Sequence, residues 1–380
     1  MYRYTDERTG KRVAIYDADL AALREKERQI AREMDDGIVT DRAAKKLTVN
    51  ALFERYIESK KLADSTRSNY IATWNNRVRD EIGGMKVVQV RPSHIRLFYS
   101  RLTKDGYSHS TIKLIHNLLY PSFEMAVDDD IIRKNPAKDA LGDNGEPAKE
   151  KMALTPSQQN RLLSFVEQSS VYNVYLPMLQ IMIGTGCRCG ELIGLTWADV
   201  DMEKKEVSIS CQLIYKNYGD GYKFHVSTPK TDAGIRKIPM SDTVYKAFAS
   251  QKRQNFLQRI PRNVEIEGRT DFIFMSKNGR PLMPSAVNNV LYNIVAAYNK
   301  QETEQAKKEK REAEYMPSIS AHTLRHTGCT RMAEQGLDMK VVQYIMGHAN
   351  IGVTMEVYNH ITEWARIENE IAKMDAVQVV

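Results

Sequence analysis

Several features are scarce in this 380-residue sequence, and each absence narrows what the chain can be. No run of about 18 apolar residues occurs, so a membrane-spanning helix is not expected. The N-terminus lacks an apolar signal core, which favours a cytoplasmic protein. The cysteines are few and scattered, so they do not suggest a disulfide framework. They are Cys187, Cys189, Cys211 and Cys329.

The overall composition is that of an ordinary soluble protein with a basic balance. Hydrophobic residues make up 42% of the chain and charged residues 27%, both usual for globular proteins. The length leaves room for two or three domains. Lysine and arginine exceed aspartate and glutamate by a formal charge of +7, which fits a polyanionic partner without requiring one.

The N-terminal region, residues 1–46, is expected to form a hairpin followed by a linking helix. Residues 1–17 alternate around a Thr9-Gly10 turn, as paired strands do. Because Met1 runs almost directly into the first strand, two interpretations stay open. The hairpin is either a sheet that lacks an upstream strand or a simple N-terminal cap.

Residues 47–140 are expected to form a module of four or five helices. Thr48, Ser65 and Ser108 stand where helix N-caps are expected, and Pro92 stands at a helix start. Polar side chains on these helices would suit a DNA-gripping surface, although a solvated surface residue is the commoner role for any one of them. The candidates are Arg67, Asn69, Arg77, Lys113 and His116.

Residues 141–156 are poor in large apolar side chains and rich in Gly, Pro, Glu and Lys, which predicts an interdomain linker. Thr155 is placed to cap the next helix.

In the domain over 157–374, the pattern changes to period two from Asp199, which predicts a small antiparallel sheet between helices. The nearly all-charged segment 300–314 is expected to be a solvated helical extension or an insertion, with no chemistry of its own.

The residues that suggest chemistry are concentrated near the C-terminus. The stretch from Ile319 to His360 carries several histidines together with Arg325 and Tyr358, and two earlier segments carry an arginine and a lysine. Arginine suits phosphodiester chemistry, since its planar fork donates two hydrogen bonds to phosphate and stays charged. The inventory predicts an enzyme that grips a phosphate diester and attacks it with a phenol. Its members are Arg188, Lys230, His322, Arg325, His348 and Tyr358.

Each of these residues has a less specific interpretation. Arg188 could simply form an i,i+3 surface pair with Glu191. His322 and His326 share a helical face at the spacing of zinc-protease motifs, although Thr323 stands where those motifs have Glu. A third metal ligand would then be His348 or Cys329, and a purely structural histidine pair is a further alternative.

Tyr358 is the candidate nucleophile because of its position close to the histidines, since the sequence contains 19 tyrosines. A free phenol has a pKa near 10 and is weakly nucleophilic at neutral pH. Two arginines and an accepting imidazole would lower that barrier. Lys230, in the turn STPKTD, could protonate the leaving oxygen as a general acid, or it could be an exposed turn lysine.

Four segments, in order, resemble the sequence boxes of the tyrosine recombinases, or phage-type integrases. TGCRCGELIGLTWADVD looks like their first-arginine box and TPKTDAGIRKIP like their catalytic-lysine hairpin. AHTLRHTGCTRM looks like their His-x-x-Arg-His box and GHANIGVTMEVYNH like their closing segment. The resemblance implies that Arg188, Lys230, His322, Arg325 and His348 activate the phosphate, that Tyr358 is the nucleophile and that Glu191 supports Arg188.

The resemblance also implies an architecture. The fold is expected to be mostly α with small antiparallel sheets (α+β), with a helical core-binding domain and a catalytic domain forming a clamp around DNA. The segment YRYTDERTGKRVAIYDADLAALREKE looks like the end of an arm-binding domain in integrases of conjugative transposons. The expected first strand is absent from it, which leaves arm-site binding in doubt.

The implied reaction is site-specific integration and excision of a mobile element through a 3′-phosphotyrosyl intermediate. It needs neither ATP nor metal, so no cofactor is expected. The implied partners are double-stranded DNA, three further copies in a tetramer joined by the tail 375–380, and an excision factor, in the bacterial nucleoid. Two other functions stay open: a type IB topoisomerase, which shares the chemistry, and a DNA-binding regulator that lost it.

Overall fold

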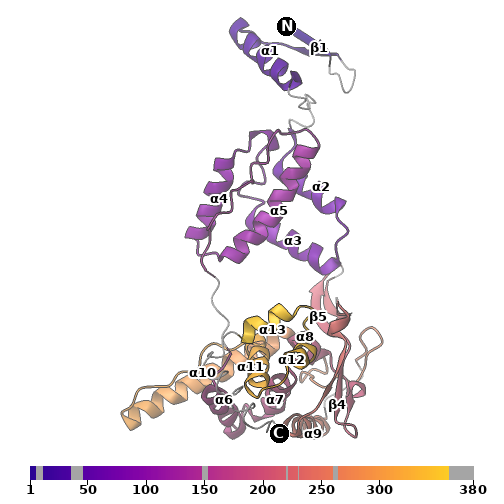
Figure 1. The fold of residues 1–380 in the computed structure, drawn as a ribbon, viewed down its shortest axis with the longest axis vertical. Helices are drawn as coiled ribbons and strands as arrows, with labels where there is room; N and C mark the ends of the chain where they lie inside the picture. Colours follow the sequence, from indigo (N-terminus) through magenta and orange to yellow (C-terminus); the bar gives the residue numbers. More distant parts are fainter. Residues whose placement is uncertain are drawn as a thin grey trace, which may run out of the picture. The chain divides into compact units, whose positions relative to one another are not determined.

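The chain divides into two compact units, Met1–Glu150 and Lys151–Val380, which Figure 1 shows. This computed structural model describes residues 1–5, 12–35, 46–147, 153–219, 221–229, 231–259 and 264–358, with backbone alone at 32–35, 353 and 356–358. The expected fold class, mostly helical with small antiparallel sheets, is confirmed. Over these ranges, no helix is both long and apolar enough to cross a membrane.

The N-terminal hairpin and helix form as the sequence predicts. β1 (Tyr2–Thr5) pairs antiparallel with β2 (Arg12–Ile15), with Tyr2 opposite Ile15. The predicted turn at Thr9-Gly10 lies outside the described residues. The linking helix α1 (Leu20–Asp35) follows directly.

The remainder of the first unit is a helical bundle with an apolar core. Thr48 and Ser108 cap their helices through side-chain hydrogen bonds from backbone amides, as predicted. The prediction for Ser65 is wrong, because the helix already begins at Asp64 and the extended Ala63 takes the N-cap position. The helices are α2 (Val49–Ser59), α3 (Asp64–Arg77), α4 (Pro92–Lys104) and α5 (His109–Asp128).

Aromatic stacking and aliphatic packing hold this bundle together. The rings of Phe53 on α2 and Trp74 on α3 stack with centroids 3.8 Å apart. The indole of Trp74 also donates to Asn50 at 2.8 Å, which satisfies its buried polar atom. One face of α5, including Ile112, Ile115 and Phe123, is fully buried against the other helices. Each such side chain contributes roughly 1.5–3 kcal/mol of burial free energy.

The second unit is built from eight helices among its described residues. They are α6 (Pro156–Gln168), α7 (Leu176–Thr185), α8 (Cys189–Gly194), α9 (Asp242–Gln258), α10 (Pro284–Glu309), α11 (Ala321–Glu334), α12 (Met339–Met346) and α13 (Ile351–Tyr358). The apolar helix α7 packs against both α9 and α11, which explains why most of its residues are buried. Thr155 caps α6 as predicted.

The period-two region forms two sheets, where a single sheet was expected. β4 (Glu206–Ile209) lies between β3 (Val200–Asp201) and β7 (Arg236–Pro239), with all pairs antiparallel. Among the described strands, β5 (Gln212–Asn217) pairs with β6 (Tyr222–Ser227) alone, as a separate hairpin. The separation arises because β5 leaves the first sheet after β4 and packs on α8.

The helical extension predicted over the charged segment 300–314 is confirmed only as far as Glu309, where α10 ends. One of its acidic residues is packed rather than solvated. Glu302 is 7% exposed, and its carboxylate accepts hydrogen bonds from the Arg311 side chain and the Glu314 backbone. Most of the other charged side chains in this segment are exposed, as expected.

Candidate active site

The first arginine is held by the junction between α7 and α8. Gly186, the C-cap of α7, is in the left-handed conformation (φ 59°), and Arg188 then occupies the N-cap of α8. A residue with a side chain is disfavoured at such a positive φ, so glycine suits this turn. Glu191, one turn into α8, accepts from the Arg188 backbone at 2.8 Å and from its Nη1 at 2.7 Å. The predicted pair is therefore present and fixes the guanidinium.

The second arginine lies buried beside the first. Arg325 on α11 is 3% exposed, and its two terminal nitrogens donate to the carbonyls of Gly186 and Met346, each at 2.5 Å. Arg188 donates to the next carbonyl, that of Gly347, at 3.1 Å. The two guanidinium groups are thus bound to adjacent carbonyls of one turn, near enough for the charge of Arg188 to affect the pKa of Arg325.

Burial and the nearby positive charge of Arg188 both affect the pKa of Arg325. Desolvation, followed by the charge of Arg188, lowers the pKa of Arg325 to about 10. Arg325 nevertheless stays protonated at neutral pH. Two like charges that remain ionised in a partly dry site favour the entry of an anion.

A third arginine, Arg236, joins this cluster and was not among the residues predicted from sequence. Its side chain is fully buried and donates to Glu191 at 2.9 Å, to the Ile345 carbonyl at 2.6 Å and to the Gly234 carbonyl at 3.1 Å. The pattern of β7 carries a signal for it. Arg236 is two residues before the buried Ile238, so it falls on the inward face of the strand.

Glu191 is the carboxylate that the arginines share. Burial alone would raise its pKa, but the hydrogen bond and charge of Arg236, together with the hydrogen bonds from Arg188, outweigh burial and lower the pKa. Its negative charge faces three arginines, so the cluster keeps a surplus of two positive charges at neutral pH. Such a surplus predicts an anionic ligand.

His348 follows directly on the turn that the arginines grip. α12 ends at Gly347, which is left-handed (φ 62°), and the Nδ1 atom of His348 lies 2.9 Å from the Thr354 hydroxyl. Burial lowers the pKa of His348 to about 4, and the charges of Arg325 and Arg188 act in the same direction. The imidazole is therefore neutral at pH 7 and able to accept a proton.

The predicted pair of histidines on α11 is in direct contact. The Nε2 atoms of His322 and His326 are 2.9 Å apart, with His322 exposed and His326 half-buried. His326 is near enough to His348 for its charge to lower the pKa of His348. This face of α11 therefore borders the arginine cluster.

A cavity of about 220 Å³ opens beside Arg188. Its lining also includes Glu191, Pro229, Thr231 and Gly347. The predicted Lys230 lies outside the described residues, but its two chain neighbours line this cavity. Tyr358 is the last residue of α13, and no side chain is described for it. α13 itself packs against α11, which carries Arg325, and against α12, which ends at Met346.

The five candidate DNA-contact residues of the helical unit have different surroundings. Asn69, Arg77 and Lys113 are exposed, and Arg77 lies over the Tyr107 ring at 4.4 Å. Arg67 is half-buried and donates to the Lys60 carbonyl at 3.3 Å.

His116 stands apart from the other four, because it packs into the edge of the bundle core. It is half-buried and lies 3.1 Å from the buried Tyr99 hydroxyl, and burial lowers its pKa. Those contacts anchor the imidazole to the core and make it the candidate least available to a ligand.

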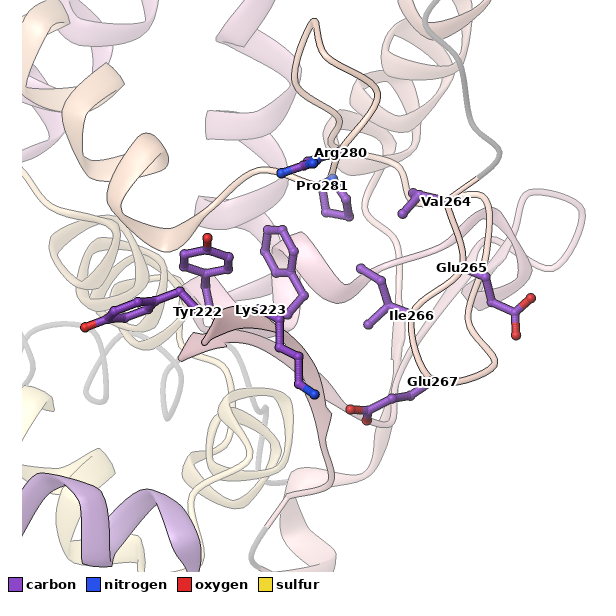
Figure 2. Close-up of a pocket in the computed structure, with 10 residues that line it drawn as sticks. Tyr222, Lys223, Val264, Glu265, Ile266, Glu267, Arg280 and Pro281 are labelled. Carbon is purple, nitrogen blue, oxygen red and sulfur yellow. The ribbon is translucent and has the colours of Figure 1, made fainter. Parts of the chain in front are cut away.

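A second, more open pocket of about 480 Å³ lies along the β5–β6 hairpin. Figure 2 shows Val264 and Ile266 facing the strand that carries Tyr222 and Lys223. Tyr222 is 70% exposed and stacks on Tyr215. This pocket shares no lining residue with the arginine cavity, so it is a separate surface feature.

Comparison with known proteins places this cluster in a family. The phage integrase family matches residues 152–364, a region that contains every residue of the arginine cluster. The transposase from transposon Tn916 of Enterococcus faecalis is 33% identical over 356 residues, which cover 92% of this chain and 83% of that protein.

Solved structures give the same answer. The Tn1549 transposon integrase in complex with a circular intermediate DNA is 31% identical, with a TM-score of 0.74 over 86% of this chain and 99% of that one. A lambda integrase tetramer bound to a Holliday junction shares the fold, at 17% identity and a TM-score of 0.55 over 94% of this chain and 91% of that one. The chain therefore belongs to the phage integrase family: it is a tyrosine recombinase of the conjugative-transposon type, an enzyme that cuts and rejoins DNA strands.

Proposed function

We propose that the arginine cluster binds the scissile phosphate of a recombination site and that Tyr358 attacks it. The observation that carries this proposal is the attachment of Arg188 and Arg325 to the adjacent carbonyls of Gly347 and Met346. Their charges, and the second N–H of each terminal nitrogen, would then neutralise charge on the non-bridging oxygens of one phosphate. The surplus of two positive charges suits a transition state that carries more negative charge than the bound diester.

The proposed step exchanges one phosphorus–oxygen bond for another. The phenolic oxygen of Tyr358 bonds to phosphorus, and the bond to the 5′ oxygen breaks. Lys230 gives its proton to that leaving oxygen, and His348, neutral at pH 7, accepts the phenolic proton of Tyr358. His322 would donate to the same phosphate from α11, and Glu191 keeps the Arg188 guanidinium aimed at it.

Rejoining follows by the reverse chemistry. The 5′ hydroxyl of the partner duplex attacks the 3′-phosphotyrosyl link, which releases the tyrosine. A phosphodiester and a phosphotyrosyl diester are of similar energy, so the bond is conserved and no nucleotide cofactor is needed. In this proposal the strand exchange integrates and excises a conjugative transposon.

The same proposal extends to the partners. Four protomers would assemble on two duplexes, each placing its tail 375–380, which lies outside the described residues, on a neighbour. The helical unit would contact backbone phosphates through Arg67, Asn69, Arg77 and Lys113, with His116 at the edge of that surface. An excision factor would bias the direction, and the reaction would take place in the bacterial cytoplasm, at the nucleoid.

A nicked duplex that loses a short fragment after cleavage tests the proposal, because rejoining is then impossible and the covalent complex accumulates. Wild-type protein should form an adduct that resists denaturing gels, and Tyr358→Phe should form none. Tyr292→Phe, which changes a 69% exposed tyrosine on α10, is the matched control and should react as wild type does.

Two results would contradict the proposal: an adduct that survives in Tyr358→Phe, or no adduct with the wild type on a duplex from the transposon ends. The topoisomerase alternative has its own signature. Relaxation of supercoiled plasmid by the protein, without any recombinant product from paired sites, would favour it.

A further inference from the structure

We propose that Arg236 is the positioning residue that aims Arg188 at the scissile phosphate. The inference rests on the proposed function of the arginine cluster and adds to it a residue that lies behind the site. Arg236 is 3% exposed, and its guanidinium is occupied by protein acceptors, so it acts through its neighbours.

Both groups that hold the Arg188 side chain are also neighbours of Arg236. The Glu191 carboxylate accepts from Arg188 at 2.7 Å through one oxygen and from Arg236 at 2.9 Å through the other. The Gly347 carbonyl accepts from Arg188 at 3.1 Å. A Cβ added at Gly347 would stand only 2.8 Å from Nη1 of Arg236, so Arg236 lies directly against that turn.

Arg236 also joins three segments that are far apart in the sequence. It bonds to Glu191 on α8, to the Ile345 carbonyl near the end of α12, and to the Gly234 carbonyl in the loop before β7. Pro229, Thr231 and Gly234 of that loop line the same cavity as Arg188. One side chain therefore sets the spacing between the loop, the α8 arginine and the turn before His348.

The planar fork of arginine is needed for this task. Three acceptors in three directions match the several fixed N–H groups of a guanidinium, which one ammonium group cannot reproduce with the same geometry. The charge of Arg236 also balances the buried Glu191, so that Arg188 keeps its own charge for the ligand. The expected consequence of losing Arg236 is a misplaced Arg188 rather than a lost phosphate contact of its own.

The test compares cleavage of two nicked duplexes by the full-length protein at saturating DNA. One has a normal scissile phosphate, and in the other a methyl group replaces a non-bridging oxygen and removes the charge. On the normal phosphate, Arg236→Gln should form the covalent adduct about 100-fold more slowly than wild type. On the neutral substrate the loss should be at most about 10-fold, because Arg188 has less charge to neutralise.

Two further variants separate positioning from folding. Arg236→Lys keeps the charge and should recover only part of the rate on the normal phosphate, which also covers the case in which Arg236→Gln does not fold. Arg269→Gln is the matched control, because Arg269 pairs with Asp199 and donates to the Gly194 carbonyl at the other end of α8. It should lower thermal stability while slowing both substrates equally and only slightly.

The outcomes are distinct. Equal losses on the two substrates in Arg236→Gln, or full activity in that variant, would overturn the positioning role while leaving the proposed function intact. Absence of any adduct with wild-type protein would overturn both. Adduct formation by wild type, with a charge-dependent loss in Arg236→Gln and partial recovery in Arg236→Lys, is the result that the proposal expects.

Discussion

The two units of this chain treat buried charge in opposite ways. Among the described residues of the helical unit, the buried polar side chains are Ser122 and Asn135, and no charged side chain is buried. The described part of the second unit buries Arg236, Arg325 and two glutamates. Both units have well-packed apolar cores, so the difference does not reflect a shortage of hydrophobic residues.

The contrast indicates that the second unit accepts a free-energy cost of buried charge that the helical unit avoids. Burying a charge costs free energy that pairing recovers only in part. The helical unit avoids that cost, and its basic residues remain on the surface, where they can contact a polyanion. In the second unit, three of the four buried charged residues belong to one cluster, around a turn beside His348. Perturbed ionisable groups gathered in this way are typical of active sites.

The largest expected effect comes from giving the cluster an apolar side chain. Arg325→Met should slow covalent-adduct formation by about 10³-fold, because the proposed mechanism uses that charge to stabilise the transition state. Stability should change little, within about 2 kcal/mol, since the repulsion from Arg188 and Arg236 disappears with the charge. Single-turnover cleavage and thermal unfolding measure the two effects. A large loss of stability with unchanged cleavage would contradict this account, because it would mean that the buried charge serves folding and not catalysis.

The opposite result is expected in the helical unit. Phe123→Ala removes a fully buried side chain from α5 and should lower the free energy of unfolding of that unit by about 3–5 kcal/mol. Cleavage of DNA already bound, measured at low temperature and saturating protein, should stay close to the wild-type rate. A slowed chemical step would show that the helical core contributes to catalysis beyond binding.

Acidification should affect the second unit through His348. Its pKa in the folded state is about 4, below the usual value of 6.5, because of burial and then the nearby arginines. Between these values the unfolded chain binds more protons than the folded one, so stability is complete above pH 6.5 and falls as pH drops toward 4. Melting temperatures over this range should fall more steeply for wild type than for His348→Gln. Parallel curves would contradict the assignment.

The smallest effect is expected for single exposed charges of the helical unit. Lys113→Ala should weaken DNA binding similarly for all sequences and reduce the slope of log affinity against log salt by about 1. Lys308→Ala on α10 removes the same charge elsewhere and is the matched control. Equal slopes for the two variants would mean that only net charge matters.

Local signals made much of the fold predictable. Thr48, Ser108 and Thr155 cap their helices because a hydroxyl can accept an N-terminal amide whatever the rest of the chain does. Ser65 failed because the extended backbone of Ala63 let the helix begin earlier without a side-chain cap. The hairpin β5–β6 was predicted as strands but assigned to the wrong sheet, since pairing partners are set by packing far along the chain.

The site was predictable where residue type carried the chemistry. Arg188, Glu191, Arg325 and His348 come together as expected, from segments more than a hundred residues apart. Arg236 was missed because one arginine in a short strand looks like a solvated charge. Its position two residues before the buried Ile238 puts it on the inward face of the strand, whereas the neighbouring Lys237 is exposed. The catalytic roles of all six candidates stay predictions: Arg188, Lys230, His322, Arg325, His348 and Tyr358.

A double-mutant cycle on Arg188 and Arg325 tests the central claim most directly, by measuring single-turnover cleavage for Arg188→Ala, Arg325→Ala and the double variant. If both guanidinium groups serve one phosphate from adjacent carbonyls, the losses should be strongly non-additive, and the double variant should be little slower than the worse single variant. Losses that multiply in full would mean that the two arginines act independently, and would contradict the account.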